Sequence, residues 1–270
     1  MDFHLIEENL RQSFRALVPG RPFGRVVELP GVSIASLGVE FQMFNAAFLS
    51  ARVDNSDELK RRIETARGHF DREGIPWSFW VCEDWLGWLA RRKLGAVFGR
   101  NGLRCSSEMP GMAATALAPL RQPLPRLDLR RVDSAKALAD FRMVGALCFH
   151  VPGNWFAEVF DSTDPEARPG FRTLVGYLDG EAVATAAYVA SPATAGPGIA
   201  GPGAVGLYNI ATIPAKRGRG IGEAVTRLAA DAARAETGRV PVVLQSSAMG
   251  RDLYQRLGFK TVARISVYNS

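Results

Sequence analysis

The feature that most constrains this chain is a basic, glycine-rich turn at residues 215–224, AKRGRGIGEA. Three glycines and three cations stand there between an apolar extended stretch and a helical pattern. Glycine loses more backbone entropy on folding than other residues, and crowded cations repel one another. A bound anion would offset both costs, because a helix N-terminus offers unpaired N–H groups and a partial positive charge. The composition of the turn leaves two interpretations open, an anion site or a strand-to-helix turn with solvated charges.

Two common phosphate motifs do not describe this turn. A P-loop needs GxxxxGK[ST], and the sequence contains no such run. A dinucleotide fingerprint needs GxGxxG, and Gly218 and Gly220 begin it, but Glu223 occupies its last position. Neither motif fits the turn.

Composition narrows the class of protein. A length of 270 residues, 47% hydrophobic and 22% charged, is typical of a globular protein of two ordinary domains. The net charge of +6 includes no block of like charges, so an acidic small molecule is expected rather than nucleic acid. Three scattered cysteines and three scattered histidines predict neither a disulfide framework nor a metal site. Without a signal-like N-terminus or a long apolar run, we expect a cytoplasmic protein with no membrane partner.

The order of predicted elements divides the chain into two similar halves. Each half reads as strands, a helix, a strand, a helix and a final strand, which indicates an α/β fold and a weak internal duplication. The run LDGEA around Asp179-Gly180 predicts a tight hairpin. The proline-rich run LAPLRQPLPRLD favours an extended linker. We therefore expect domains at residues 1–124 and 125–270.

Two motifs in the second half carry a family resemblance. Residues 217–222, RGRGIG, fit R-x-x-G-x-G between a strand and a helix, and residues 253–259, LYQRLGF, fit L-Y-x-x-L-G-F on the next helix. In this order and on these elements, the second half resembles the GNAT superfamily of acyl-CoA N-acyltransferases over about residues 127–270. The first half resembles a degenerate copy, because its corresponding turn, DNSDE, is acidic. The implied fold is α/β, two GNAT-like halves, each a central mixed sheet flanked by helices.

The resemblance implies a role for each matching residue. Backbone N–H groups of the turn would bind the pyrophosphate of coenzyme A, and strand backbone would bind its pantetheine arm. Ser247 stands where many members have a cofactor-binding asparagine, and we expect it to cap the last helix. Tyr254 matches the usual general acid, with packing on the sheet as the alternative. The expected cofactor-binding residues are Ile210, Ala211, Thr212, Arg217, Gly218, Arg219, Gly220, Ile221, Gly222 and Ser247.

The general base is the open question at this stage. Family members often use a glutamate on the strand that here reads LYNI, at residues 207–210, and this strand has no carboxylate. His150 is a weak candidate, and Glu158 and Asp161 are weaker ones. Cys148 is expected to be a small buried thiol rather than a nucleophile. The tryptophans of the first half are open to three interpretations, as core, acceptor pocket or subunit interface.

The leading hypothesis is an N-acetyltransferase that moves an acetyl group from acetyl-CoA to a small-molecule or peptide amine by direct attack, without metal. A sensor or scaffold that binds acyl-CoA is the alternative, and transfer of a longer acyl or aminoacyl group is a third reading. The sequence leaves open the acceptor, the acyl length, the role of the first half and whether the protein forms a homodimer.

Overall fold

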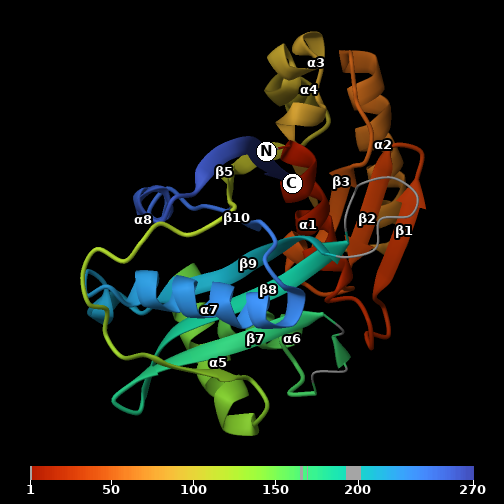
Figure 1. Ribbon diagram of the computed structural model, residues 1–270. Helices are drawn as coiled ribbons and strands as arrows, with labels where there is room; N and C mark the ends of the chain where they lie inside the picture. Colours follow the sequence, from red (N-terminus) through yellow and green to blue (C-terminus); the bar gives the residue numbers. More distant parts are fainter. Residues whose placement is uncertain (1, 165–166, 169, 193–201) are drawn as a thin grey trace.

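The strands of this protein form one continuous mixed sheet. The computed structural model describes residues 2–164, 167–168, 170–192 and 202–270. The strands are β1 (Arg25–Leu29), β2 (Val32–Ser36), β3 (Asn45–Leu49), β4 (Ser78–Cys82), β5 (Arg104–Ala114), β6 (Asp128–Arg131), β7 (Phe171–Leu178), β8 (Glu181–Pro192), β9 (Pro202–Thr212), β10 (Val242–Gln245) and β11 (Lys260–Asn269). Within the described residues their order is β1-β2-β3-β4-β11-β5-β10-β9-β8-β7-β6 (Figure 1).

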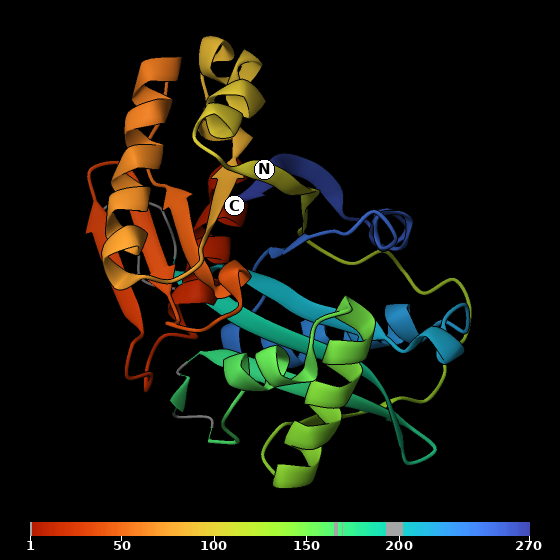
Figure 2. The ribbon, with the colours of Figure 1, turned by 180° about the vertical axis from the view of Figure 1, so that it is seen from behind.

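Helices cover both faces of this sheet. They are α1 (Phe3–Arg15), α2 (Ser56–Glu73), α3 (Trp88–Arg92), α4 (Leu94–Arg100), α5 (Ala135–Phe149), α6 (Gly153–Val159), α7 (Ile221–Thr237) and α8 (Arg251–Arg256). Helices α5 and α6 lie on the opposite side of the second half from α7 (Figure 2). Within the described part of the chain, none of these helices has the length and apolarity needed to cross a bilayer.

The two halves repeat one supersecondary pattern. In the first half, β1, β2 and β3 pair antiparallel, and β4 follows α2 and pairs parallel with β3. In the second half, β6 to β9 pair antiparallel, and β10 follows α7 and pairs parallel with β9. The predicted hairpin is confirmed, because Asp179 and Gly180 join β7 to β8 with φ of +52° and +82°. The α/β fold class with a central mixed sheet flanked by helices is likewise confirmed.

The last strand of each half lies beside a strand of the other half. Strand β11, at the end of the chain, pairs antiparallel with β4 and with β5 of the first half. Strand β5 in turn pairs with β10 of the second half. The proposed boundary at 124/125 lies in the connection between β5 and β6. This boundary divides the sequence, but the strands on its two sides belong to the same continuous sheet.

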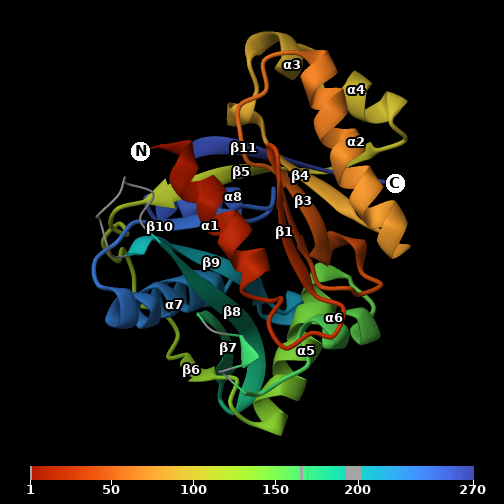
Figure 3. The ribbon, with the colours of Figure 1, turned by 90° about the vertical axis from the view of Figure 1, so that its right-hand side faces the viewer.

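Helix α1 connects the two halves on one face of the sheet (Figure 3). Its apolar side chains pack in the same core cluster as residues of β3, β4, β8 and β9. Two glycines allow this close approach, since a Cβ at Gly206 would lie 1.8 Å from Asn9 Oδ1 and one at Gly111 would lie 2.9 Å from Ile6. The buried Asn9 side chain donates to the carbonyl of Val189 at 3.1 Å and accepts from the Tyr208 hydroxyl at 2.7 Å. These bonds satisfy a buried amide and fix α1 against the second half.

Candidate functional site

The glycine-rich turn forms the N-terminus of α7. Gly218 and Gly220 have φ of +75° and +78°, a region that side chains with a Cβ rarely adopt. Gly220 is the N-cap and provides no side-chain hydrogen bond to the helix. The first backbone bond of the helix is donated by Ala224 to the Gly220 carbonyl at 3.0 Å. The N–H groups of residues 221–223 therefore have no partner within the helix and are available to an anion.

Two of the three cations of the turn are exposed, and the third, Lys216, is half-buried and ion-paired with Glu181. Arg217 and Arg219 are both exposed, and the Arg217 side chain donates to the Thr212 carbonyl at 3.1 Å. A Cβ at Gly222 would meet Leu253 of α8 at 3.2 Å and the Thr212 hydroxyl at 3.8 Å. The predicted residues Thr212, Arg217 and Gly222 are thus brought together where β9 ends and α7 begins. The positive helix end and the arginines give this place a consistent positive potential.

Strands β9 and β10 separate just before this turn. Their parallel pairing is limited to Val205 with Val242 and Gly206 with Val243. Beyond that point, residues 207, 208, 211 and 212 of β9 pair with β8, and no described residue from 207 to 212 pairs with β10. The predicted residues Ile210, Ala211 and Thr212 all belong to this segment. Backbone N–H and C=O groups along such a gap are available to an extended ligand.

A β-bulge interrupts β9 inside the gap. Asn209 has φ of +49°, and the register with β8 shifts beside it, between Thr185 and Ala187. The Thr185 hydroxyl donates to the Asn209 carbonyl at 2.7 Å, which holds the bulge in place. Bulges re-aim strand residues and are frequent beside active sites. Sequence analysis missed Asn209, although asparagine within an apolar strand is a signal, because it tolerates positive φ better than most residues.

Helix α8 brings Tyr254 to the same region. The side chain is 7% exposed and its ring packs edge-on against Phe259. Burial raises the pKa of Tyr254 above its ordinary value, so the phenol keeps its proton. Among the described residues its hydroxyl has no hydrogen-bond partner, and Tyr254 lines a cavity. A buried, protonated hydroxyl beside a cavity can donate a proton to a group that enters it.

The prediction that Ser247 is the N-cap of α8 is wrong. Helix α8 begins at Arg251 with Gly250 as its N-cap, and Ser247 lies three residues earlier. The Ser247 hydroxyl accepts from the Gly250 N–H at 3.2 Å in the turn that precedes the helix. The reason is steric in part, since a Cβ at Gly250 would lie 2.8 Å from the Tyr254 ring, so the glycine allows the turn to tighten there. Ser247 also lines the cavity and is exposed at that place.

The cavity next to Tyr254 has a volume of about 500 Å³ and is lined by both halves. Ile210, Leu244 and Tyr254 contribute from the second half, and Phe14 and Trp80 from the first. The tryptophans of the first half lie in different places, and Trp85 is partly buried with its ring edge-on to Phe3. Trp80 lines the cavity, Trp77 is a core residue stacked on Phe70, and Trp88 is 66% exposed. Sequence analysis offered an acceptor pocket as one alternative and gave no means to choose Trp80.

The weaker base candidates lie outside this cavity. His150 ends α5 in the left-handed region with φ of +53° and is exposed, although its neighbours Phe149 and Val151 line the cavity. Asp161 forms ion pairs with Arg168 and Arg21. Glu158 accepts the Glu40 N–H at 3.3 Å. These positions explain both carboxylates as structural groups.

Cys148 is half-buried rather than buried as expected. Burial raises the pKa of its thiol, and the neighbouring Arg217 guanidinium opposes that shift without cancelling it. A thiol with a raised pKa is a poor nucleophile at neutral pH. The interpretation of Cys148 as unreactive therefore agrees with its surroundings.

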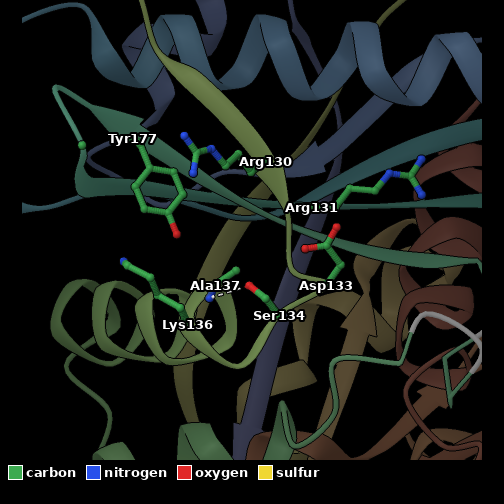
Figure 4. Close-up of a pocket in the computed structure, with 8 residues that line it drawn as sticks. Arg130, Arg131, Asp133, Ser134, Lys136, Ala137 and Tyr177 are labelled. Atoms are coloured by element: carbon green, nitrogen blue, oxygen red, sulfur yellow. Dashed lines mark hydrogen bonds between the residues drawn. The ribbon is translucent and has the colours of Figure 1, made fainter.

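A second, smaller pocket of about 220 Å³ lies where β6, the start of α5 and the turn after β7 meet (Figure 4). The Tyr177 ring lies between two cations, with the Arg130 guanidinium 4.9 Å and the Lys136 ammonium 5.4 Å from its centroid. Both cations are already paired, Arg130 with Asp128 and Lys136 with Asp140. No predicted site residue lines this pocket, and its charges stabilise the local structure.

Comparison with known proteins agrees with this geometry. Residues 169–261 match the family model for the acetyltransferase (GNAT) domain. The chain therefore carries a GNAT acetyltransferase domain, and this domain contains the glycine turn, the strand gap and Tyr254. Among curated proteins, no match is found.

Solved structures share the fold over most of the chain. A GCN5-related N-acetyltransferase from Kribbella flavida is 20% identical, covers 98% of this chain and 95% of its own, and has a TM-score of 0.68. A GCN5-related N-acetyltransferase from Sphaerobacter thermophilus is 15% identical, with coverage of 89% and 76% and a TM-score of 0.54. A tandem GNAT protein from the clavulanic acid biosynthesis pathway is 13% identical, with coverage of 96% and 87% and a TM-score of 0.52. At these identities the likeness concerns the fold.

Proposed function

We propose that this protein is an N-acetyltransferase that moves an acetyl group from acetyl-CoA to an amine acceptor by direct attack. The observation that carries the proposal is the alignment of three features along one path: the open N-terminus of α7, the gap between β9 and β10, and the Tyr254 hydroxyl beside the cavity. A pyrophosphate, an extended arm and a reacting group would occupy these three places in that order. The catalytic part is residues 125–270.

The residues present fit the anionic part of acetyl-CoA. N–H groups of the α7 first turn and the exposed Arg217 and Arg219 would hold the pyrophosphate through charge-assisted bonds, each worth roughly 1.5–3 kcal/mol before screening by solvent. Gly218 and Gly220 keep side chains away from this place. Acetyl-CoA supplies the acyl group as a thioester, whose sulfur leaves as a thiolate.

Tyr254 is the proposed general acid. Because burial raises its pKa, the phenol stays protonated at the pH at which the thiolate departs. It then donates its proton to that sulfur. Backbone groups of residues 210–212 that face the gap, other than the Thr212 carbonyl bonded to Arg217, would orient the arm that leads to the thioester.

The competing function is an acyl-CoA sensor or scaffold. The observation that favours it is the lack of a carboxylate among the described residues of the cavity, which leaves the reaction without an obvious base. Turnover distinguishes the two functions, since both bind acyl-CoA and an enzyme alone releases free thiol when an amine is added.

The test combines binding and turnover. Isothermal titration of acetyl-CoA into the wild-type protein is expected to give a saturable heat that is absent in Gly220→Glu. Thiol release with an amine panel is then expected in the wild-type protein and strongly reduced in Tyr254→Phe. Binding without thiol release would favour the sensor, and no binding would reject both functions.

A further inference from the structure

The cavity beside Tyr254 contains an unusual combination of size and chemistry. Its volume of about 500 Å³ exceeds what the acetyl end of a thioester needs, so most of it is open to a second molecule. Part of its wall comes from the first half, with Phe14 of α1, Phe41 and Phe44 around the short helix at residues 42–44, and Trp80 of β4. This wall is aromatic and packed edge-to-face, with Phe14 and Trp80 5.1 Å apart between ring centroids.

Charge is missing from the described lining of this cavity. Among those residues there is no aspartate, glutamate, lysine, arginine or histidine. Two of the polar side chains are bonded to other groups, while the buried Gln245 Nε2 has no partner among the described residues and brings no charge. The Ser13 hydroxyl donates to the Leu10 carbonyl at 2.7 Å, and the Tyr208 hydroxyl donates to Asn9 at 2.7 Å. An ammonium group that entered would therefore lose water and gain no counter-charge.

This environment selects among amines by their protonation state. Desolvation without an opposite charge disfavours the cationic form of an amine, so a strongly basic amine has to shed its proton before it enters. A weakly basic amine is already neutral at pH 7 and loses nothing. Aromatic walls also stabilise a flat, apolar body through offset and edge-to-face contacts.

We propose that the acceptor is a weakly basic amine on an apolar aromatic body, of the arylamine class, held between the two halves of the chain with its nitrogen toward Tyr254. This inference rests on the proposed acetyltransferase function and adds the substrate class. It also gives the first half a role, since α1, residues 41–44 and β4 form the acceptor wall.

The reaction then needs no separate base. The neutral nitrogen uses its lone pair to form a C–N bond to the thioester carbonyl carbon. The C–S bond breaks, the sulfur leaves with the bonding pair, and it takes the proton of the Tyr254 hydroxyl. The tyrosinate takes one proton from the acylated nitrogen, which leaves an amide, free thiol and neutral Tyr254. The balance is one amine and one thioester converted to one amide and one thiol.

The first test uses the wild-type protein and two acceptors of matched size, aniline and cyclohexylamine, with saturating acetyl-CoA and thiol release as the readout. With aniline, kcat/KM is expected to be flat from about pH 6 to about pH 9, because the neutral form prevails throughout. With cyclohexylamine, kcat/KM is expected to rise about tenfold per pH unit, because the neutral fraction does so. At pH 7 aniline is expected to be the better substrate by at least about tenfold.

A second test changes the charge of the wall. Met43 lines the cavity from the first half and is half-buried, so its side chain can be replaced without emptying the core. Met43→Glu is expected to lower kcat/KM for aniline about tenfold and to raise it for cyclohexylamine, because the carboxylate pairs with the ammonium. Met43→Gln, a control of the same shape without charge, is expected to leave the preference unchanged. Acetyl-CoA affinity is expected to be equal in both variants.

The outcomes separate this inference from the function on which it rests. Failure of the wild-type protein to bind acetyl-CoA would reject the function itself. If acetyl-CoA binds and cyclohexylamine or spermidine reacts as fast as aniline at pH 7, the function stands and the acceptor class is wrong. The class is also wrong if aniline neither binds to the acetyl-CoA complex nor reacts. Tighter binding of octanoyl-CoA than of acetyl-CoA would overturn it too, because the cavity would then hold an acyl chain.

Discussion

Helices α2 and α7 follow equivalent strands in the two halves, yet their N-termini are opposite in character. At α2 the Asn55 side chain accepts the N–H groups of Asp57 and Glu58 at 3.1 and 2.9 Å, and the Glu58 carboxylate accepts the Asp54 N–H at 3.2 Å. At α7 a glycine cap leaves the N–H groups open, and the preceding turn is basic. One position of the fold is thus closed by its own side chains in the first half and open to an anion in the second.

The neighbouring strands differ in the same sense. Strands β3 and β4 stay paired up to Phe48 with Trp80, one residue before β3 ends. Strands β9 and β10 lose their pairing after Gly206, and the remaining residues of β9 border a gap. An open helix end and an open strand pair therefore occur together in the second half, and neither occurs in the first. This coincidence is what makes the second half a candidate for coenzyme A.

The largest expected effect is on acetyl-CoA binding, and it comes from blocking the open N-terminus of α7. Gly220→Glu forces a side chain into φ of +78°, brings its Cβ 3.3 Å from Pro125, and adds a negative charge where an anion is proposed. Loss of up to about 2 kcal/mol from the helix end and roughly 2 kcal/mol of repulsion by the new carboxylate give about 4 kcal/mol, or about a thousandfold in the Kd of acetyl-CoA. Backbone strain of roughly 1–2 kcal/mol lowers the stability of the free and the bound protein alike. Isothermal titration measures this change in Kd. The control Gly68→Glu, on the exposed face of α2 with open space around it, is expected to leave Kd unchanged.

The next effect concerns chemistry rather than binding. Tyr254→Phe is expected to lower kcat about a hundredfold, because the proton donor is lost, while Kd for acetyl-CoA stays the same. Because the pKa of Tyr254 is raised, the wild-type phenol stays protonated as pH rises, and kcat is expected not to fall up to about pH 9. Rate measurements across that range check both statements. A loss of kcat below about pH 9 in a fully folded protein would argue that another group is the acid.

A smaller effect is expected from removing one exposed cation of the turn. Arg219→Ala is expected to weaken acetyl-CoA binding about tenfold at low salt, and by less at high salt, because an exposed charge is screened. The same substitution at Arg61, an exposed position of α2, removes equal charge far from the turn and is the matched control. Equal weakening by both variants would mean that net charge, rather than the site, attracts the ligand.

The smallest effect is on stability alone. Asn55→Ala removes the cap of α2 and is expected to cost about 1 kcal/mol of unfolding free energy, seen as a lower Tm in a thermal melt. Acetyl-CoA affinity is expected to be unchanged, since the closed end has no ligand. A changed Kd in this variant would mean that the first half takes part in cofactor binding.

Local features of the chain were predictable because local sequence decides them. The hairpin at Asp179-Gly180 and the glycine turn at residues 217–222 follow from backbone preferences that a few residues express by themselves. The capping of α8 by Ser247 failed because the helix begins later, after a turn that Gly250 allows beside Tyr254. The start of the helix depends on the contact between Gly250 and the Tyr254 ring, and the preference of serine for N-cap positions carries no information about that contact.

Contacts between segments that are distant in the sequence could not be predicted from the sequence. No pattern in residues 260–269 indicates that this strand inserts between β4 and β5 rather than at an edge. The cavity likewise combines α1, residues 41–44 and β4 of the first half with Tyr254 of α8, across more than half of the chain. Periodicity identifies which side of each segment is apolar, and it does not identify which other segment will cover it.

The position of β11 also has a consequence for how the chain is made. The first half emerges from the ribosome before the second, but the place between β4 and β5 stays empty until residues 260–269 have been synthesised. Until then β4 and β5 each offer an unpaired edge, which is prone to pair with other chains. Residues 260–269 therefore act as a closing strand between the two halves of the sheet. A chain truncated before Lys260 is expected to accumulate as aggregate rather than as a folded first domain.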